Sequence, residues 1–195
     1  MRNSNSWHEL KQLIYADYKR HLNMRGAIWS ISFHVTFWFR ICSWLYQKNK
    51  FTRIIGSPLH QWYKFLNLLS GIQLPICTKV EGGLKFFHYN CIVLAQATKI
   101  GKNCSIHQGV TLGRVFNGPK SGVPTIGNNV VIFAGAKILG GVYLSDNVIV
   151  GANAVVTKDV PENCVVAGVP ARIISTDSSK CFDKEWAYHF GRNNE

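Results

Sequence analysis

Aliphatic residues recur at every sixth position through the C-terminal half of this chain. The series runs without a miss through Ile126, Ile132, Ile138, Leu144, Val150 and Val156. Four positions after each of these comes a second small or β-branched residue, at Val130, Ala136, Val142, Val148, Ala154 and Val160. A helix repeats near 3.6 residues and a strand at 2, so neither explains a strict period of six.

Three hexads make one triangular coil, and stacked coils bury both sets of side chains inside a prism. The same register begins at Val80, slips by two residues before Ile100 and continues to Leu112. A turn-rich excursion over residues 113–125 then interrupts it. Gly and Asn in "IGKN", "IGNN" and "VGAN" occupy the turns, where a positive φ is often required. The pattern therefore predicts a parallel β-helix.

The first third of the chain has a helical pattern instead. In residues 6–22, Ser6 is a suitable N-cap with Glu9 three residues on, followed by a one-sided apolar series. Residues 27–46 are almost wholly apolar, with Arg40 the only formal charge. Their length suits a membrane span, but His34 and Arg40 would be costly at mid-bilayer. A helix buried against a partner subunit, or lying in the membrane interface, is favoured.

A further apolar segment covers residues 57–74, and the helices are expected to end near Gly71. We therefore expect a helical region over residues 1–72, a β-helix over 73–176 and a C-terminal tail over 177–195.

Composition adds a strongly basic N-terminal region to this picture. The 195 residues are 47% hydrophobic and 16% charged, which is typical of a folded chain. The net charge is +12, and residues 1–72 hold ten Lys and Arg against two acids. Such a surplus suits a membrane surface or an acidic polymer, or forms only a solvated basic face. A nucleic-acid partner is disfavoured because no known binding motif accompanies the charge.

The six cysteines form no dense framework, and no apolar stretch resembling a signal peptide opens the sequence. We therefore expect reduced thiols and a cytoplasmic protein, with peripheral contact at the inner face of the cytoplasmic membrane as a further expectation.

Four segments carry a resemblance to a known family. The stretch "VVTKDVPENCVVAGVPARII", residues 155–174, resembles the C-terminal signature of the hexapeptide-repeat acyltransferases. Residues 82–94 and 98–113, "GGLKFFHYNCIVL" and "TKIGKNCSIHQGVTLG", most resemble serine acetyltransferases and their relatives that O-acetylate surface polysaccharides. Upstream, "WFRICSWLY" also resembles a piece of their helical domain. The resemblance implies a mainly β fold, a left-handed parallel β-helix of hexapeptide repeats preceded by an α-helical N-terminal region.

The resemblance also implies an acetyl-CoA-dependent O-acetyltransferase that acts as a homotrimer, with acetyl-CoA between neighbouring prisms. The general base of the family falls on His88. A His of near-neutral pKa can take the proton of an alcohol as it attacks a thioester, so no metal is expected. His107 lies one coil later at nearly the same register and is expected to have a secondary catalytic role.

The family's coenzyme A contacts carry over to small residues and to cations. The expected cofactor-binding residues are Gly113, Ala134, Gly135, Lys158 and Arg172, with Lys120 a weaker candidate. The expected acceptor-binding residues are Asp17, Gln73 and Arg114.

Two departures from serine acetyltransferases bear on the acceptor. The family's Asp fifteen residues before the catalytic His and its Asp directly before that His are Gln73 and Phe87 here. The Arg-His pair that holds the substrate carboxylate is replaced by Gly122 and Val123. These changes favour a sugar hydroxyl of a surface polysaccharide, free or lipid-linked, over serine.

Serine O-acetylation for cysteine biosynthesis and a non-catalytic β-helix scaffold stay open as alternatives. A zinc site formed by His88, Cys91, Cys104 and His107 is a further rival, suggested by the two-Cys, two-His spacing. It is disfavoured because Cys104 occupies an inward position of the coil whereas His107 should point outward.

Overall fold

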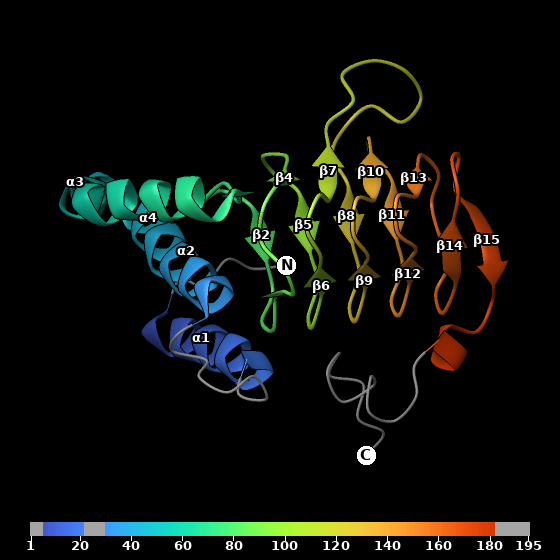
Figure 1. The fold of residues 1–195 in the computed structure, drawn as a ribbon. Helices are drawn as coiled ribbons and strands as arrows, with labels where there is room; N and C mark the ends of the chain where they lie inside the picture. The colour runs from blue at the N-terminus through green and yellow to red at the C-terminus, as the bar shows by residue number, and fades with distance from the viewer. Residues whose placement is uncertain (1–5, 22–29, 182–195) are drawn as a thin grey trace.

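A computed structural model of the chain describes residues 6–21 and 30–181. Helices gather at one end, and a three-sided prism of short parallel strands extends away from them (Figure 1). The helices are α1 (Trp7–His21), α2 (Ile31–Lys48), α3 (Lys50–Ile55) and α4 (Ser57–Ser70). Among the described helices, none combines the length and apolar character needed to cross a membrane.

Each face of the prism is one sheet in which strands from successive coils pair in parallel, except that β15 on face C is antiparallel and the last coil adds only the Val160 bridge to face B. Face A contains β1 (Ile72–Gln73), β4 (Ile92–Leu94), β7 (Thr111–Gly113), β10 (Lys137–Leu139) and β13 (Val155–Val156). Face B contains β2 (Lys79–Val80), β5 (Lys99–Ile100), β8 (Thr125–Ile126) and β11 (Tyr143–Leu144). Face C contains β3 (Lys85–Phe86), β6 (Ser105–Ile106), β9 (Val131–Ile132), β12 (Ile149–Val150), β14 (Val165–Ala167) and the antiparallel β15 (Arg172–Ser175).

The interior of the prism is built from the two sixfold series of the sequence. Ile126, Ile132 and Ile138 are fully buried, as are Val130 and Ala136 between them. Strand pairing places Ile132 beside Val150 and Ile138 beside Val156, eighteen residues apart in each case. The predicted parallel β-helix is therefore confirmed. Its first two coils differ from the eighteen-residue coils only by a wider turn between faces A and B.

The excursion over residues 114–124 also leaves the prism at the corner between faces A and B, directly after β7 (Figure 1). A short antiparallel bridge between Val115 and Gly122 closes it on itself. Lys120 in the loop forms an ion pair of 2.6 Å with Asp159, two coils further along. Asp159 also accepts a hydrogen bond from the backbone N–H of Tyr143. The loop is thus attached to the prism at its far end as well as at its base.

The corner between faces B and C carries a ladder of four asparagines. Asn103, Asn129, Asn147 and Asn163 all adopt a positive φ of 56°, 54°, 59° and 58°. The side-chain amide of each donates to the Oδ1 of the next. Asn tolerates the left-handed conformation better than other non-glycine residues. The ladder therefore satisfies both the turn geometry and the side-chain hydrogen bonds at this corner.

The helical region is joined to the first coil by a buried ion pair between Asp17 of α1 and Arg40 of α2. Arg40 Nε donates to Asp17 Oδ2 at 2.9 Å, and both side chains are almost fully buried. Asp17 Oδ1 also accepts from the backbone N–H groups of Gly83 and Leu84. The guanidinium of Arg40 in turn donates to the carbonyl oxygens of Val80 and Glu81. One ion pair thus fixes two helices against the turn that precedes β3.

Arg20 of α1 makes a second attachment, donating to the carbonyl oxygen of Asn103 and to Ser105 Oγ. Ser32 at the start of α2 makes a third, since its Oγ accepts from the backbone N–H of Phe86 at 3.0 Å. The predicted cap of α1 is confirmed as well, because Ser6 Oγ accepts from the Glu9 N–H at 3.1 Å. The contacts of Arg20 and Ser32 hold the helices against the first two coils, the first of which carries His88.

Candidate active site

His88 lies in the turn that follows β3, at the corner between faces C and A, and it is exposed. Two successive residues of this turn have positive φ angles, Asn90 at 94° and Cys91 at 54°. The N–H of Asn90 donates to the carbonyl oxygen of Ser70 at the end of α4, and its own carbonyl accepts from Gly109 in the next coil. The turn is therefore attached on both sides, which gives His88 a defined position while leaving its imidazole accessible.

His107 projects outward from face C, but it is buried apart from 8% of its surface. Its ring stacks on Phe87 at 4.9 Å between centroids, with 5° between the planes, and lies 4.9 Å from Phe133 on the other side. Burial, reinforced by the proximity of His88, lowers the pKa of His107 to about 4. The ring is therefore neutral near pH 7 and sits within a column of aromatic side chains.

The two imidazole rings are 6.0 Å apart between centroids. Strand pairing aligns Phe86 with Ile106, so His107 is in register with Phe87 and not with His88. An acceptor hydroxyl can approach the exposed ring of His88 more readily than the buried ring of His107. The geometry is therefore compatible with a direct role for His88 and an indirect role for His107.

The four residues of the rival zinc site do not converge. Cys104 is fully buried inside the prism, where its Sγ lies 3.1 Å from the carbonyl oxygen of Gly127. His88 and Cys91 are exposed in the turn outside it. Among the residues that the structure describes, no group of three or more His, Cys, Asp or Glu side chains is arranged to hold a metal ion.

The predicted coenzyme A glycines have a second physical explanation. A Cβ at Gly113 would come within 2.7 Å of Leu139 Cδ2, and one at Gly135 would collide with Oδ1 of Asn153. Gly135, whose φ is 74°, is thus required for coil-to-coil packing whether or not a ligand approaches, whereas at Gly113 a small shift of the Leu139 side chain would make room for a Cβ. Ala134 precedes Gly135 at the corner between faces C and A, the corner that carries His88 two coils earlier along the prism.

Of the three predicted cations, two are exposed near the C-terminal end of the prism. Lys158 follows β13, and Arg172 begins β15. The backbone N–H of Ala171 donates to Val155 in β13, which brings the two segments together. This pair of cations fits the polyanionic nucleotide end of coenzyme A. Lys120 fits it less well, since its charge is already compensated by Asp159.

The three predicted acceptor residues have different environments. Asp17 is completely buried and fully hydrogen-bonded by Arg40 and two backbone N–H groups, so the structure gives it a structural role instead. Gln73 is exposed on face A and lines a groove of about 410 Å³ between α4 and the first coil. Arg114 is exposed at the base of the excursion loop and donates to the carbonyl oxygen of Gln96.

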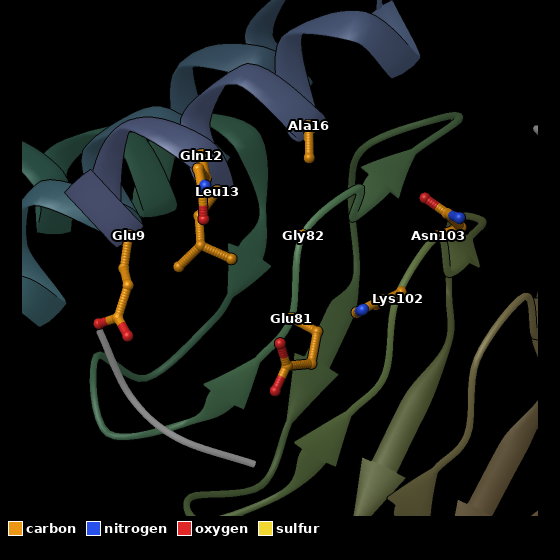
Figure 2. A pocket seen from close by; sticks show the side chains of 8 residues that line it. All are labelled: Glu9, Gln12, Leu13, Ala16, Glu81, Gly82, Lys102 and Asn103. Carbon is orange, nitrogen blue, oxygen red and sulfur yellow. The ribbon is translucent and has the colours of Figure 1, made fainter. Parts of the chain in front are cut away.

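A second groove, of about 450 Å³, lies between α1 and the corner between faces B and C (Figure 2). Figure 2 shows the Glu9 carboxylate entering it from α1, and the Glu81 carboxylate and the Lys102 amine entering it from the β-helix. His88 lies at a different corner of the prism, so none of the predicted site residues lines this groove. A Cβ at Gly82 would lie 2.8 Å from that of Ala16, which explains the glycine at this close approach of the helix.

Lys85 lies next to the predicted site and was not among the predicted site residues. Its ammonium is 4.4 Å from the centroid of the Phe87 ring, and only 1% of the residue is exposed. Burial, with a smaller contribution from Arg20, lowers its pKa to about 8. The available signal was its outward position two residues before Phe87, which places both on the same side of face C.

Comparison with known proteins identifies the family. The family model for bacterial transferase hexapeptide (six repeats) matches residues 124–158. A serine acetyltransferase from Helicobacter pylori is 35% identical over 146 residues, which cover 74% of this chain and 81% of that protein. One from Synechococcus elongatus is 38% identical over 137 residues, 69% of this chain but only 53% of the relative.

The chain belongs to the hexapeptide-repeat acyltransferase family. Within it, the relatives named above place the chain in the serine acetyltransferase-like subgroup. The crystal structure of the serine acetyltransferase from Brucella abortus in complex with coenzyme A superposes with a TM-score of 0.73 at 28% identity, over 88% of this chain and 70% of that one. The predicted left-handed β-helix with N-terminal helices is thereby confirmed. The chain spans about half the length of the Synechococcus relative.

Proposed function

We propose that this chain transfers an acetyl group from acetyl-CoA to an acceptor hydroxyl, with His88 as the general base. The observation that carries the proposal is the exposed imidazole of His88 on a turn fixed by Ser70 and Gly109, in a chain of this family. The solved relative in complex with coenzyme A supports acetyl-CoA as the donor.

In the proposed reaction, a nitrogen of His88 takes the proton of the acceptor hydroxyl while the oxygen attacks the thioester carbonyl carbon. The tetrahedral intermediate collapses with cleavage of the carbon–sulfur bond, and the imidazolium returns the proton to the sulfur of coenzyme A. His107 acts as a neutral neighbour that packs beside the base. Lys158 and Arg172 bind the phosphates of the nucleotide.

The names of the relatives favour L-serine as the acceptor, and with it the cysteine-biosynthetic alternative of the sequence analysis. Serine is therefore the first acceptor to test. Acetylation at sub-millimolar serine would support this function, and its rate would then be expected to depend on a cation that pairs with the serine carboxylate. Arg114, exposed at the base of the excursion loop, is the candidate for that cation.

A sugar hydroxyl of a surface polysaccharide is the second candidate, favoured by Gly122 and Val123. These residues stand where the family's carboxylate-binding pair would be, and the short bridge between Val115 and Gly122 holds this part of the loop. Loss of a charge-assisted pair lowers affinity by about 1.5–3 kcal/mol, roughly ten- to more than a hundredfold. A glycan recovers that affinity through many weaker contacts.

The proposed site requires a trimer, because acetyl-CoA lies between neighbouring prisms in the family resemblance. Val131 on the prism surface is already buried within the single chain, so it adds little to a subunit contact. Tyr143 is exposed and is available for one. Sedimentation is expected to give a trimer at micromolar protein, and a monomer would contradict a site shared between subunits.

The proposed function is tested by single-turnover and steady-state acetyl transfer with L-serine and a panel of glycans. His88→Ala is expected to reduce turnover about 10²- to 10⁴-fold while acetyl-CoA affinity is retained. His107→Ala is expected to reduce it less, and a reversed ranking would transfer the role of base to His107. Binding of acetyl-CoA without transfer to any acceptor would indicate a non-catalytic β-helix.

A further inference from the structure

The outer surface of α3 and α4 is apolar where solvent meets it. Seven large side chains of these two helices are exposed, from 46% at Trp62 to 79% at Leu68. We call them the helical apolar patch: Phe51, Ile54, Ile55, Trp62, Phe65, Leu68 and Leu69. The opposite side of α4 buries Tyr63 and Ser70 against the rest of the protein. A surface helix that is apolar on both sides is expected to bury its outer side against another molecule.

An aromatic groove of about 560 Å³ continues this patch. It lies between α2 and α4 and is lined by Phe33, His34, Phe37, Trp38, Leu59 and Trp62. Trp62 belongs to both the groove and the patch, so the two form one surface. Trp62 also lies 5.7 Å from Phe65 between ring centroids, which makes the aromatic strip continuous along α4.

This surface has no acidic counterpart in its part of the chain. From residue 18 to residue 80 the sequence contains no Asp or Glu. Four cations of α2, α3 and α4 are exposed at or between the apolar residues: Lys48, Lys50, Arg53 and Lys64. Apolar side chains next to uncompensated cations are typical of segments that lie in the interface of an anionic bilayer.

We propose that the helical apolar patch docks on the surface of an anionic lipid bilayer. The Trp62 and Phe65 rings enter the interfacial region, and the four cations contact lipid headgroups. Trp is well suited to this position, because its ring is apolar while its N–H can reach water or a headgroup. The helices lie on the membrane and do not cross it, in keeping with the limited length and hydropathy of those described.

Charge favours this occupant over a second copy of the chain. A two-fold contact brings the same patch of both copies together, so its cations would face each other with no carboxylate supplied by residues 18–80 of either copy. A bilayer with anionic headgroups instead supplies the missing negative charge. The proposal is independent of the acetyl acceptor, because binding to vesicles is measured without turnover.

The test is flotation of the full-length protein with vesicles of phosphatidylcholine alone or with about a third of phosphatidylglycerol. The protein is expected to float with the anionic vesicles at low salt and to be released as salt rises. Phe65→Ser/Leu69→Ser is expected to reduce the bound fraction at least tenfold, since each side chain contributes apolar area. Ile174→Ser, an exposed apolar position on β15 at the other end of the prism, is the matched control and retains binding.

A charge variant tests the second component separately. Each cation near an anionic surface contributes about fivefold to partitioning, so Lys48→Glu/Lys50→Glu is expected to reduce binding about 25-fold or more. The matched control is Lys79→Glu/Lys99→Glu, which reverses two exposed cations paired on face B. An equal loss of vesicle binding in both charge variants would mean that binding depends only on the net charge of the protein, which would overturn the proposal.

Failure of the wild-type protein to bind anionic vesicles at low salt would also overturn it. A patch that joins copies of the chain would give a different result: an assembly larger than a trimer that Phe65→Ser/Leu69→Ser dissociates in sedimentation. That outcome, together with absent flotation, would assign the surface to a protein interface.

Discussion

Replacing Asp17 with Asn tests whether the helical region is held to the β-helix by a buried charge. Asp17 and Arg40 are 0% and 4% exposed, and the Asp17 carboxylate accepts four hydrogen bonds. An Asn in the same place can still accept from the backbone N–H groups of Gly83 and Leu84. Its amide nitrogen, however, would face the guanidinium donors of Arg40, which would be left as a buried cation without an anion.

Removing one partner of a buried ion pair destabilises proteins by about 3–5 kcal/mol. Arg40 keeps the carbonyl oxygens of Val80 and Glu81 as acceptors, so the lower end of that range, about 3 kcal/mol, is expected for Asp17→Asn. Asp17→Ala also leaves two buried N–H groups without an acceptor, at about 1–3 kcal/mol each. The expected order of stability is therefore wild type, then Asn, then Ala.

The measurement is urea unfolding followed by circular dichroism at a fixed protein concentration, since assembly contributes to apparent stability. Arg40→Met and the Asp17→Asn/Arg40→Met double variant complete a cycle. Coupling of at least about 1 kcal/mol is expected, because the two side chains are in direct contact. A folded Asp17→Asn variant within about 1 kcal/mol of wild type, with a raised acceptor KM, would refute this reasoning and return Asp17 to the acceptor site.

Three further outcomes are expected. His107 has a pKa of about 4, below the usual value, so the unfolded chain binds more protons there between about pH 6.5 and 4. The free energy of unfolding therefore falls by up to about 3 kcal/mol on acidification through that window. Urea unfolding at several pH values is expected to show a weaker pH dependence of this free energy for His107→Phe, and an unchanged pH dependence would mean that the pKa of His107 is not lowered. Burial lowers the pKa of Lys85 to about 8, so Lys85→Met raises the free energy of unfolding at pH 7 by about 1–3 kcal/mol. That difference shrinks as pH rises from 8 to 10, and a destabilised variant at pH 7 would contradict it. Asp159→Asn frees Lys120 and speeds tryptic cleavage of the excursion loop with little change in Tm, whereas an unchanged cleavage rate would mean that this exposed ion pair does not restrain the loop.

The interior of the prism could be predicted from the sequence because its rule is local. Ile126 and Val130 are buried for the same reason as every other member of their series, and each coil repeats the rule. The slip before Ile100 and the excursion after Gly113 were visible as breaks in that rule. The capping of α1 by Ser6 was predictable for the same reason, since cap and partner are three residues apart.

Contacts between distant segments carried no such signal. Asp17 meets Gly83 across 66 positions of sequence, and a polar residue on a helix is ordinarily assigned to the surface. The alignment of His107 with Phe87, one position away from His88, depends on where each coil turns. The role of His88 follows from family resemblance, because one exposed imidazole has no periodicity to identify it. The reversal of β15 was also not predicted from the sixfold series, since it leaves the register.

The eighteen-residue spacing between Ile132 and Val150 means that the prism lengthens by one coil for every eighteen residues. Duplicating residues 138–155 would add one coil and move β15 outward by about 4.8 Å, the spacing of neighbouring strands. An insertion of another length within a strand would shift the inward series out of step, whereas extra residues at a corner are accommodated as a wider turn or a loop, as they are after β7. Because His88 and His107 lie in the first coils, beside the helices, the far end can be lengthened or shortened by whole coils while their local geometry is kept.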